Sequence, residues 1–313
     1  MAETISPREV QSASAASAET LGQLGLHGKK RRQASLWGDA WRRLRKNKLA
    51  IAGLLVVILL SLIAIFAPLL AREPIDAQNY DSLYAQPSAA YPMGADQLGR
   101  DILSRVIWGA RVSLLVGIVA QFIVLAIGVP IGALAGFFGG RTDLILMRFV
   151  DVMYAFPTLL FVVLLMSMFG RGLDKIFLVI GLTSWVTLAR LVRAQFLTLR
   201  EKDYVVAARS IGADDLRLII KHMLPNALTP IIVALTFGVP SAIFTEAFLS
   251  FIGSGIAPPQ TSWGLMVGEN QSYLRSYPWM LVWPSVALGL TMLAFTFLGD
   301  GLRDALDPSA KKD

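Results

Sequence analysis

The chain has 313 residues, of which 55% are hydrophobic and 16% are charged, whereas soluble domains carry about 25% charged residues. This composition excludes an ordinary soluble domain, and several uncharged apolar runs of about 20 residues indicate an integral membrane protein. The sequence contains no cysteine, which excludes disulfides, iron–sulfur clusters and thiolate zinc sites, and only His27 and His222 offer imidazole. No metal or other cofactor is expected, and the net charge of +7 indicates membrane topology rather than binding to nucleic acid.

Residues 1–36 precede the first apolar run and are rich in Ala, Ser and Gln, with a basic cluster at Lys29–Arg32. They contain no apolar stretch long enough for a signal-peptide core, so we predict a disordered cytoplasmic tail. In the following stretch, Trp37, Trp41 and Leu44 share one helical face among basic residues. This pattern is typical of a short helix at the membrane interface, and a simple cluster of charge that sets topology explains it equally well.

Six apolar runs then predict six transmembrane helices, because lipid cannot satisfy loose backbone groups and runs of this length form helices. Arg190 and Arg193 follow the fourth run closely and can reach the headgroups from its end. The fold class is therefore an all-α membrane protein. The predicted spans are Leu49–Leu70, Ser113–Phe138, Val152–Phe169, Ile176–Ala189, Pro230–Ile252 and Pro278–Leu298.

The distribution of basic residues predicts the orientation. Of the 29 Lys and Arg residues, 22 lie before the first span or in segments 139–148, 190–229 and 299–313. Because Lys and Arg gather on the cytoplasmic side of membrane proteins, both termini are expected in the cytoplasm. The charged loop at residues 200–229 then also lies in the cytoplasm.

This loop reads as two helical pieces that meet at Gly212, which can adopt the left-handed conformation that ends a helix. Asp214 or Asp215 can cap the second piece, and Pro225 is expected to end it. Leu216, Ile219, Ile220 and Met223 form the apolar stripe of that piece. The loop is either an ordinary solvated segment or a docking element that lies in a groove of a cytoplasmic partner.

The loop sequence "AARSIGADDLRLIIKHMLP" resembles the coupling-loop signature of binding-protein-dependent ABC importer permeases, written EAA, three residues, G, nine residues, I-x-LP. Ala207, Ala208 and Gly212 match this signature, whereas Val206 replaces its Glu and His222 replaces its Ile. The resemblance implies that this loop contacts an ATPase through the following residues: Asp203, Tyr204, Ala207, Ala208, Arg209, Gly212, Ala213, Asp214, Leu216, His222, Leu224 and Pro225.

The resemblance extends over residues 41–308 and is similar to the dipeptide/oligopeptide branch of that family. The matching stretches are Met93–Leu114, residues 139–160, Glu246–Met266 and Leu298–Pro308. It implies the type I ABC importer permease fold, with residues 37–112 holding the interfacial helix, the first span and an extracytoplasmic segment. Residues 113–308 then form the transmembrane domain, and residues 309–313 form a C-terminal tail.

The resemblance also implies partners and a place in the cell. These are a second homologous permease, two cytoplasmic ATPases, an extracytoplasmic binding protein, membrane lipid, and dipeptides or oligopeptides as substrate, in a bacterial or archaeal cell membrane. Relatives in this branch also carry nickel complexes, glutathione, haem or oligosaccharides. The sequence contains no G-x-x-x-x-G-K-[ST] motif and no catalytic constellation, which agrees with a non-catalytic subunit.

Within the spans, Glu246, Pro157 and Pro240 are the candidates for lining or gating a pathway. Glu246 could equally be a hydrogen-bonding partner between helices, and the prolines are expected to kink their helices. Arg148 and Asp151 lie three residues apart and are expected to pair. A self-powered secondary transporter or channel is the alternative function, although one intramembrane acid is weak support for ion coupling.

Residues 253–277, between the last two runs, are too long for a simple turn and suggest a structured surface or a re-entrant piece. Together with residues 71–112, they are the expected docking surface for a binding protein. The alternative is a loop that packs only against its own bundle.

Overall fold

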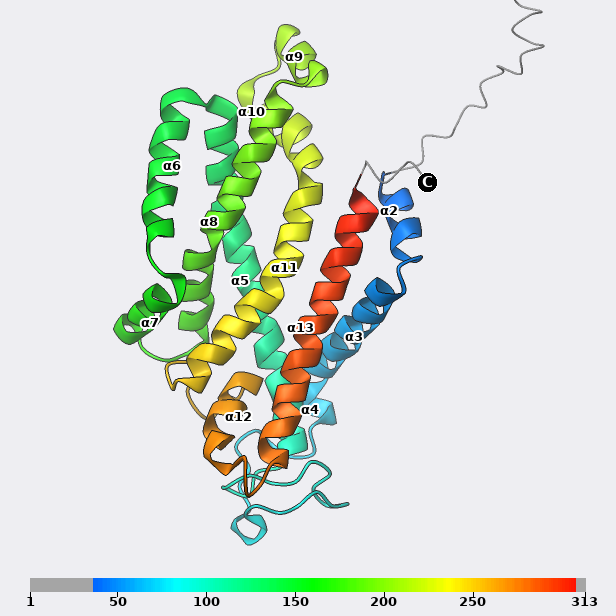
Figure 1. The fold of residues 1–313 in the computed structure, drawn as a ribbon, viewed down its shortest axis with the longest axis vertical. Helices are drawn as coiled ribbons and strands as arrows, with labels where there is room; N and C mark the ends of the chain where they lie inside the picture. The colour runs from blue at the N-terminus through cyan, green and yellow to red at the C-terminus, as the bar shows by residue number, and fades with distance from the viewer. Residues whose placement is uncertain (1–35, 308–313) are drawn as a thin grey trace, which may run out of the picture.

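The computed structural model describes residues 36–307, which form a bundle of long helices packed side by side (Figure 1). Within that range the regular elements are helical, apart from one isolated bridge between Ala95 and Asp101. The tails predicted at residues 1–36 and 309–313 lie outside the described residues, except that helix α2 already begins at Leu36. The disorder expected in these tails stays a prediction.

Five helices are long and apolar enough to cross a membrane, and a bent pair of helices forms a sixth span. The five are α3 (Lys48–Ile65), α5 (Ile102–Phe138), α8 (Leu173–Arg200), α11 (Leu224–Phe251) and α13 (Trp279–Leu306). The pair consists of α6 (Gly140–Ala155) and α7 (Thr158–Phe169). The all-α membrane fold predicted from the apolar runs is thus confirmed.

The second span begins eleven residues earlier than predicted, because α5 starts at Ile102 and not at Ser113. The added turns include Arg105, which is only 3% exposed. Its guanidinium contacts Asp96 at 2.7 Å and Glu269 at 2.9 Å, so its charge is neutralised inside the protein. A search for uncharged runs stops at the exposed Arg111 and therefore never reaches Arg105.

Helices α5 and α8 pack closely along three glycines spaced four residues apart: Gly128, Gly132 and Gly136. A Cβ added at Gly132 would lie 2.4 Å from the carbonyl oxygen of Ala189, and one at Gly136 would lie 2.6 Å from that of Arg193. Without side chains at these positions the two backbones can approach, as is typical of helix pairs in membranes. This pair is the central wall of the bundle.

The third span is broken where Pro157 was predicted to kink it. Phe156 is extended, with φ −79° and ψ 130°, as expected for the residue before a proline. Helices α6 and α7 meet there at 84°. By contrast, helix α11 is continuous through Pro240, and a kink at that position stays a prediction.

Helix α6 is held mainly at its surface, because Val150 is its one buried residue. Two arginines of α8 reach across to it: Arg190 contacts Asp151 at 2.7 Å, and Arg193 pairs with Asp143. The expected pairing of Asp151 with Arg148 is therefore wrong. The i, i+3 spacing allowed that pair, but α8 presents a nearer arginine.

The end of the bundle opposite α9 carries α4 (Ala67–Leu70), α12 (Trp263–Asn270) and two short 3₁₀ turns, Tyr80–Ser82 and Gln271–Tyr273 (Figure 1). Ser262 caps α12 by accepting a hydrogen bond from the Leu265 N–H at 3.1 Å. Trp263 is fully buried, and its indole N–H donates to the Val106 carbonyl at 3.0 Å. The prediction that residues 253–277 are structured is confirmed.

Helix α2 (Leu36–Leu44) is present where a short interfacial helix was predicted. Ala40 and Leu44 are buried against Ala50 and Ala305, so the helix packs on the ends of α3 and α13. Trp41 stays 45% exposed on the other side. This arrangement suits a helix that lies beside the bundle with a tryptophan facing the interface.

Candidate functional site

The predicted loop forms the tip of the bundle and consists of α9 (Asp203–Ser210), the single turn α10 (Asp215–Arg217) and a π-helical stretch (Leu218–Met223). Figure 1 shows α9 beyond the ends of the other helices. Helix α8 leads into the loop and α11 leaves it directly. The loop is therefore attached at both sides to helices of the central bundle.

Gly212 has φ +86°, the left-handed conformation that the sequence predicted. Its N–H donates to the carbonyl of Arg209 at 3.0 Å, and the N–H of Ala213 donates to that of Ala208 at 3.1 Å. These two bonds form a Schellman motif, in which a left-handed residue closes the end of a helix. The motif sets the angle between α9 and the following turn.

The inner face of the loop is anchored in the protein core. Val205, Ala208, Leu218 and Met223 are each at most 9% exposed. They belong to the same buried cluster as Phe137 of α5 and Phe196 of α8. These contacts hold both helical pieces of the loop against α5 and α8.

The outer face of the loop exposes apolar side chains. Ile211 is 87% exposed, Leu216 is 63% exposed and Val206 is 52% exposed. The predicted apolar stripe does not pack as one surface, because Met223 is buried while Leu216 and Ile220 face outward. A concentrated apolar surface on an otherwise charged tip is typical of a protein interaction site.

The expected end of the second helical piece at Pro225 is wrong. The chain passes through the π-helical stretch into α11 without a break. The Leu224 N–H donates to the carbonyl of Ile219, five residues earlier, as in a π-helix. Pro225 then occupies the first turn of α11, where a missing N–H costs little.

The remaining loop residues have separate roles in the structure. The guanidinium of Arg209 lies 5.4 Å from the ring centre of Phe137, which adds a contact to α5. Asp214 occupies the N-cap position of α10 but makes no side-chain capping bond. The His222 carbonyl accepts a bond from the Asn226 amide at 2.6 Å. The other predicted loop residues that lie exposed are Asp203, Tyr204, Ala207 and Pro225.

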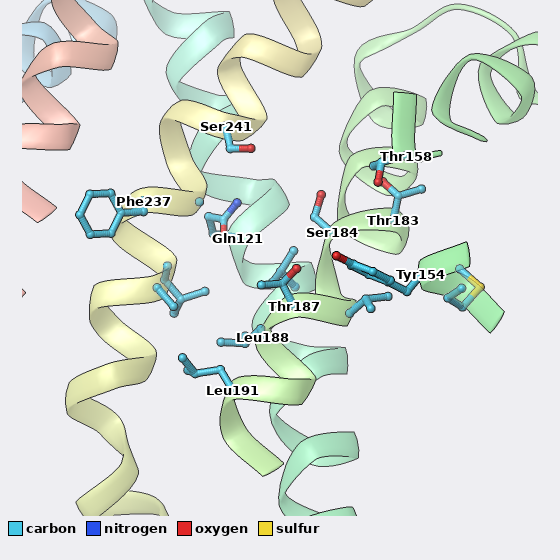
Figure 2. A pocket seen from close by; sticks show the side chains of 16 residues that line it. Gln121, Tyr154, Thr158, Thr183, Ser184, Thr187, Leu188, Leu191, Phe237 and Ser241 are labelled. Carbon is cyan, nitrogen blue, oxygen red and sulfur yellow. The ribbon is translucent and has the colours of Figure 1, made fainter. Parts of the chain in front are cut away.

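A second candidate site is a cavity of about 390 Å³ between α5, α8 and α11, with residues of α6 and α7 at its margin (Figure 2). Its lining has no charged side chain. It combines aliphatic groups with seven neutral polar residues: Gln121, Tyr154, Thr158, Thr183, Ser184, Thr187 and Ser241.

Most of these polar groups make no hydrogen bond to another residue that the structure describes. The hydroxyl of Thr183 donates to the carbonyl of Val179 at 2.9 Å. Within residues 36–307, no hydrogen bond is formed by the side chains of the other six. Gln121 is only 9% exposed, and its side chain lines the cavity. Because polar groups inside a protein normally have hydrogen-bond partners, unpartnered groups around one cavity suit it to a polar occupant.

Two of the predicted pathway residues adjoin this cavity. Pro157 precedes Thr158 at the break in the third span, and Pro240 precedes Ser241 on α11. Both prolines are thus neighbours of lining residues and are not lining residues themselves. Whether they take part in gating stays a prediction.

Glu246 lies away from the cavity. It is fully buried and accepts hydrogen bonds from the hydroxyls of Ser250 at 2.7 Å and Ser262 at 2.6 Å. These are the contacts of a hydrogen-bonding partner between helices, the second of its two predicted roles. The carboxylate ties α11 to the start of α12, and a pathway role for it stays a hypothesis.

The sequence interpretation did not select Gln121, Ser184 or Thr187. It searched the spans for ionisable groups and prolines, and these three are neutral. A signal was nevertheless present, because each is a polar residue inside a long apolar segment. Their convergence on one space depends on the packing of α5 against α8.

Two family models match parts of this chain. Residues 128–312 match the family described as binding-protein-dependent transport system inner membrane component. Residues 35–87 match the N-terminal transmembrane domain of oligopeptide transport permease C.

Full-length relatives are similar over most of the chain. The chain is 45% identical over 282 residues to the oligopeptide transport system permease protein OppC of Bacillus subtilis (strain 168), covering 90% of this chain and 92% of that protein. It is 45% identical over 284 residues to the dipeptide transport system permease protein DppC of the same organism, covering 90% and 89%. It is 42% identical over 278 residues to the glutathione transport system permease protein GsiD of Escherichia coli O6:K15:H31 (strain 536 / UPEC), covering 88% and 91%.

The fold is similar to that of a chain in the inward-facing MetNI methionine ABC transporter, with a TM-score of 0.55 and 19% identity. The match covers 66% of this chain and 98% of that chain, and at this identity it establishes the fold alone. Together with the family match over more than half of the sequence, these findings show that the chain is a membrane protein of the binding-protein-dependent transport system inner membrane component family, in its oligopeptide and dipeptide permease branch.

Proposed function

We propose that this chain is a permease subunit of an ATP-driven importer of short peptides. The observation that carries the proposal is the anchored loop, whose apolar outer face projects beyond the bundle while its inner face joins the core. Relatives named for oligopeptides, dipeptides and glutathione support peptides as the substrate class. The subunit itself has no catalytic role and binds no ATP.

The loop docks in a groove of a cytoplasmic ATPase. Ile211 and Leu216 supply the apolar contact, and the helical form of α9 suits a groove between structural elements. Two such ATPases and a second, homologous permease complete the transporter, and a binding protein delivers the substrate from outside. The buried anchors of the loop carry the ATPase movement into α5 and α8.

Both termini and the loop face the cytoplasm in this proposal. Helix α2, the C-terminal end of α13 and α9 lie toward the same end of the bundle, which supports one common side (Figure 1). The concentration of 22 of the 29 basic residues in the segments of that side supports the same orientation. The opposite end, with α12 and residues 71–101, then receives the binding protein.

A self-powered secondary transporter is less well supported. Such transporters use ionisable groups inside the membrane to couple ions or protons to the substrate. Here Glu246 bonds two serine hydroxyls, and Arg190 and Arg193 are paired with aspartates of α6. These contacts give each group a structural role.

The test is to purify the tagged chain with its partners and to reconstitute the complex in proteoliposomes. ATP inside the vesicles and the binding protein outside should drive uptake of radiolabelled dialanine, trialanine or glutathione. Uptake driven by a proton gradient, without ATP or an ATPase subunit, would favour the secondary transporter. A chain that purifies alone would also contradict the proposal.

A further inference from the structure

We propose that the cavity between α5, α8 and α11 is a transit site that binds the main chain of the transported peptide through neutral hydrogen-bonding groups. The inference rests on the proposed function and adds to it the residues that meet the substrate within the membrane. Gln121 is the central residue of this site, and Ser184, Thr187 and Ser241 surround it (Figure 2).

The first argument is the set of unpartnered polar groups that face the cavity. Gln121 is nine-tenths buried in a membrane span and makes no hydrogen bond among the described residues. The side chains of Ser184, Thr187 and Ser241 also make none and line the same space. Because polar groups inside a membrane span need hydrogen-bond partners, a polar occupant of the cavity can supply them. The site is thus prepared for a ligand that donates and accepts hydrogen bonds.

The second argument is that the fold makes room for this amide. A Cβ at Gly238 of α11 would lie 2.1 Å from the side-chain oxygen of Gln121, so a side chain at position 238 would displace the end of the Gln121 side chain. The amide of Gln121 therefore lies directly over the backbone of α11. The absence of a side chain at Gly238 leaves room for the amide in this place.

The third argument is the chemistry of the lining. An amide side chain offers two donors and an acceptor, and hydroxyls offer both functions, which matches the N–H and C=O groups of a peptide. No charged side chain lines the cavity, so it does not select for charged side chains. Leu188, Leu191 and Phe237 provide apolar surface for side chains of different shapes. This combination recognises the main-chain N–H and C=O groups that all peptides share and tolerates different side chains.

The size of the cavity agrees with this ligand class. Its volume of about 390 Å³ lies near the lower end of the range of about 300–1,000 Å³ for small-molecule sites. A short peptide segment fits such a space, whereas a folded domain does not. The guanidinium of the neighbouring Arg190 pairs with the Asp151 carboxylate at 2.7 Å and lies 4.2 Å from the ring centre of Tyr154. It therefore adds no unpaired charge to the margin.

The test uses the reconstituted importer and whichever of radiolabelled dialanine, trialanine and glutathione the wild type takes up. Gln121→Leu keeps the side-chain size but removes the amide that would bind the peptide, and we expect uptake at saturating loaded binding protein to fall about tenfold. Gln121→Asn, which keeps the amide, should retain part of the activity. Gly238→Ala should lower uptake in the same direction because its Cβ displaces the Gln121 amide.

Thr296→Val on α13 is the matched control. Its hydroxyl lies in a span as well, but it donates to the Met292 carbonyl at 2.9 Å and does not line the cavity. Uptake by this variant should equal that of the wild type. Basal ATPase activity and the thermal midpoint of Thr296→Val should also equal those of the wild type. A thermal midpoint of the Gln121→Leu complex at or above that of the wild type shows that its lower uptake is not a loss of folding.

A second measurement locates the peptide directly. A benzophenone-containing tripeptide, irradiated during turnover, should label residues 183–191 of α8. Labelling confined to other segments would overturn the inference. Uptake at the wild-type rate by a triple variant, Gln121→Leu with Ser184→Ala and Thr187→Val, would also overturn it. If the wild-type complex takes up none of the peptides with ATP, the proposed function itself fails, so failure of the transit site and failure of the importer function give different results.

Discussion

Gly212 combines an unusual backbone conformation with open surroundings. Its φ is +86°, and no heavy atom lies within 4 Å of an added Cβ. A substitution there therefore causes backbone strain and not a clash, at a cost of about 1–3 kcal/mol. That cost falls on the turn that orients the exposed residues Ile211 and Leu216.

We predict that Gly212→Val uncouples ATP hydrolysis from peptide uptake without preventing membrane insertion. The strained turn shifts the outer face of the loop, while the buried anchors at its inner face keep the bundle intact. The measurements are uptake and ATPase activity in proteoliposomes. Gly212→Asn should be milder because Asn tolerates the left-handed region.

Gly289→Val is the control for this change, because Gly289 of α13 also has no atom within 4 Å of an added Cβ but has no positive φ. Its coupling should be unaffected. Undiminished uptake by Gly212→Val would count against the docking role of the loop.

Arg105 illustrates how much a buried charge depends on its partners. It shares Asp96 and Glu269 with Arg100, and its second amino group donates to the Thr261 hydroxyl at 3.2 Å. Asp96 is fully buried. The network joins the segment before α5 to α12, so its loss affects the whole end of the bundle opposite the loop.

We predict that Arg105→Met destabilises the protein by about 3–5 kcal/mol, because it leaves buried carboxylates short of positive charge. The measurement is thermal unfolding in detergent. Arg111→Met on the same helix is the control, since Arg111 is exposed and forms no ion pair among residues 36–307. Adding Asp96→Asn to Arg105→Met should recover part of the loss, and equal midpoints for the two single variants would contradict the argument.

At the scale of elements, α6 differs from the other helices in how it is attached. Gly139 precedes it with φ +64°, Gly140 begins it with φ +51°, and the break before Pro157 follows it. Its two ion pairs with α8 add to a small apolar contact around its one buried residue, Val150. A helix attached in this way is expected to open locally more easily than its neighbours.

We predict that Asp143→Asn accelerates hydrogen exchange in α6 more than Asp151→Asn does. The Asp143 side chain is 18% exposed, whereas that of Asp151 is 54% exposed, and exposed ion pairs contribute only about 0–1 kcal/mol. The measurement is exchange followed by mass spectrometry in nanodiscs. Hydrogen exchange in α8 should stay unchanged. Equal effects of the two variants would show that the burial of an ion pair does not determine how much it stabilises α6.

At the scale of the whole molecule, orientation in the membrane can be tested cleanly because the chain contains no cysteine. Ile211 is 87% exposed at the tip of the loop, and Tyr80 is 67% exposed at the opposite end. We predict that a membrane-impermeant maleimide labels Tyr80→Cys in intact cells. Ile211→Cys should be labelled only after the membrane is opened, and the reverse pattern would invert the proposed orientation.

Much of this architecture could be predicted from the sequence because its signals are local. The first predicted span, Leu49–Leu70, coincides with α3 and α4, since hydrocarbon excludes unpaired backbone and favours a helix wherever the run is apolar. Gly212 could be identified as the turn from the sequence because a glycine, which lacks a Cβ, adopts the left-handed conformation without strain. The loop signature likewise consists of neighbouring residues.

Only the tertiary structure decided the features that depend on distant partners. Arg105 lies inside α5 because Asp96 and Glu269 neutralise it, and no pattern within α5 indicates this. The cavity exists because α5, α8 and α11 bring Gln121, Ser184 and Ser241 around one space. Local sequence determined the spans and the turn because solvation and backbone sterics act on each residue alone. Packing determined the charged start of α5 and the transit site because hydrogen bonds and ion pairs need partners far away in the chain.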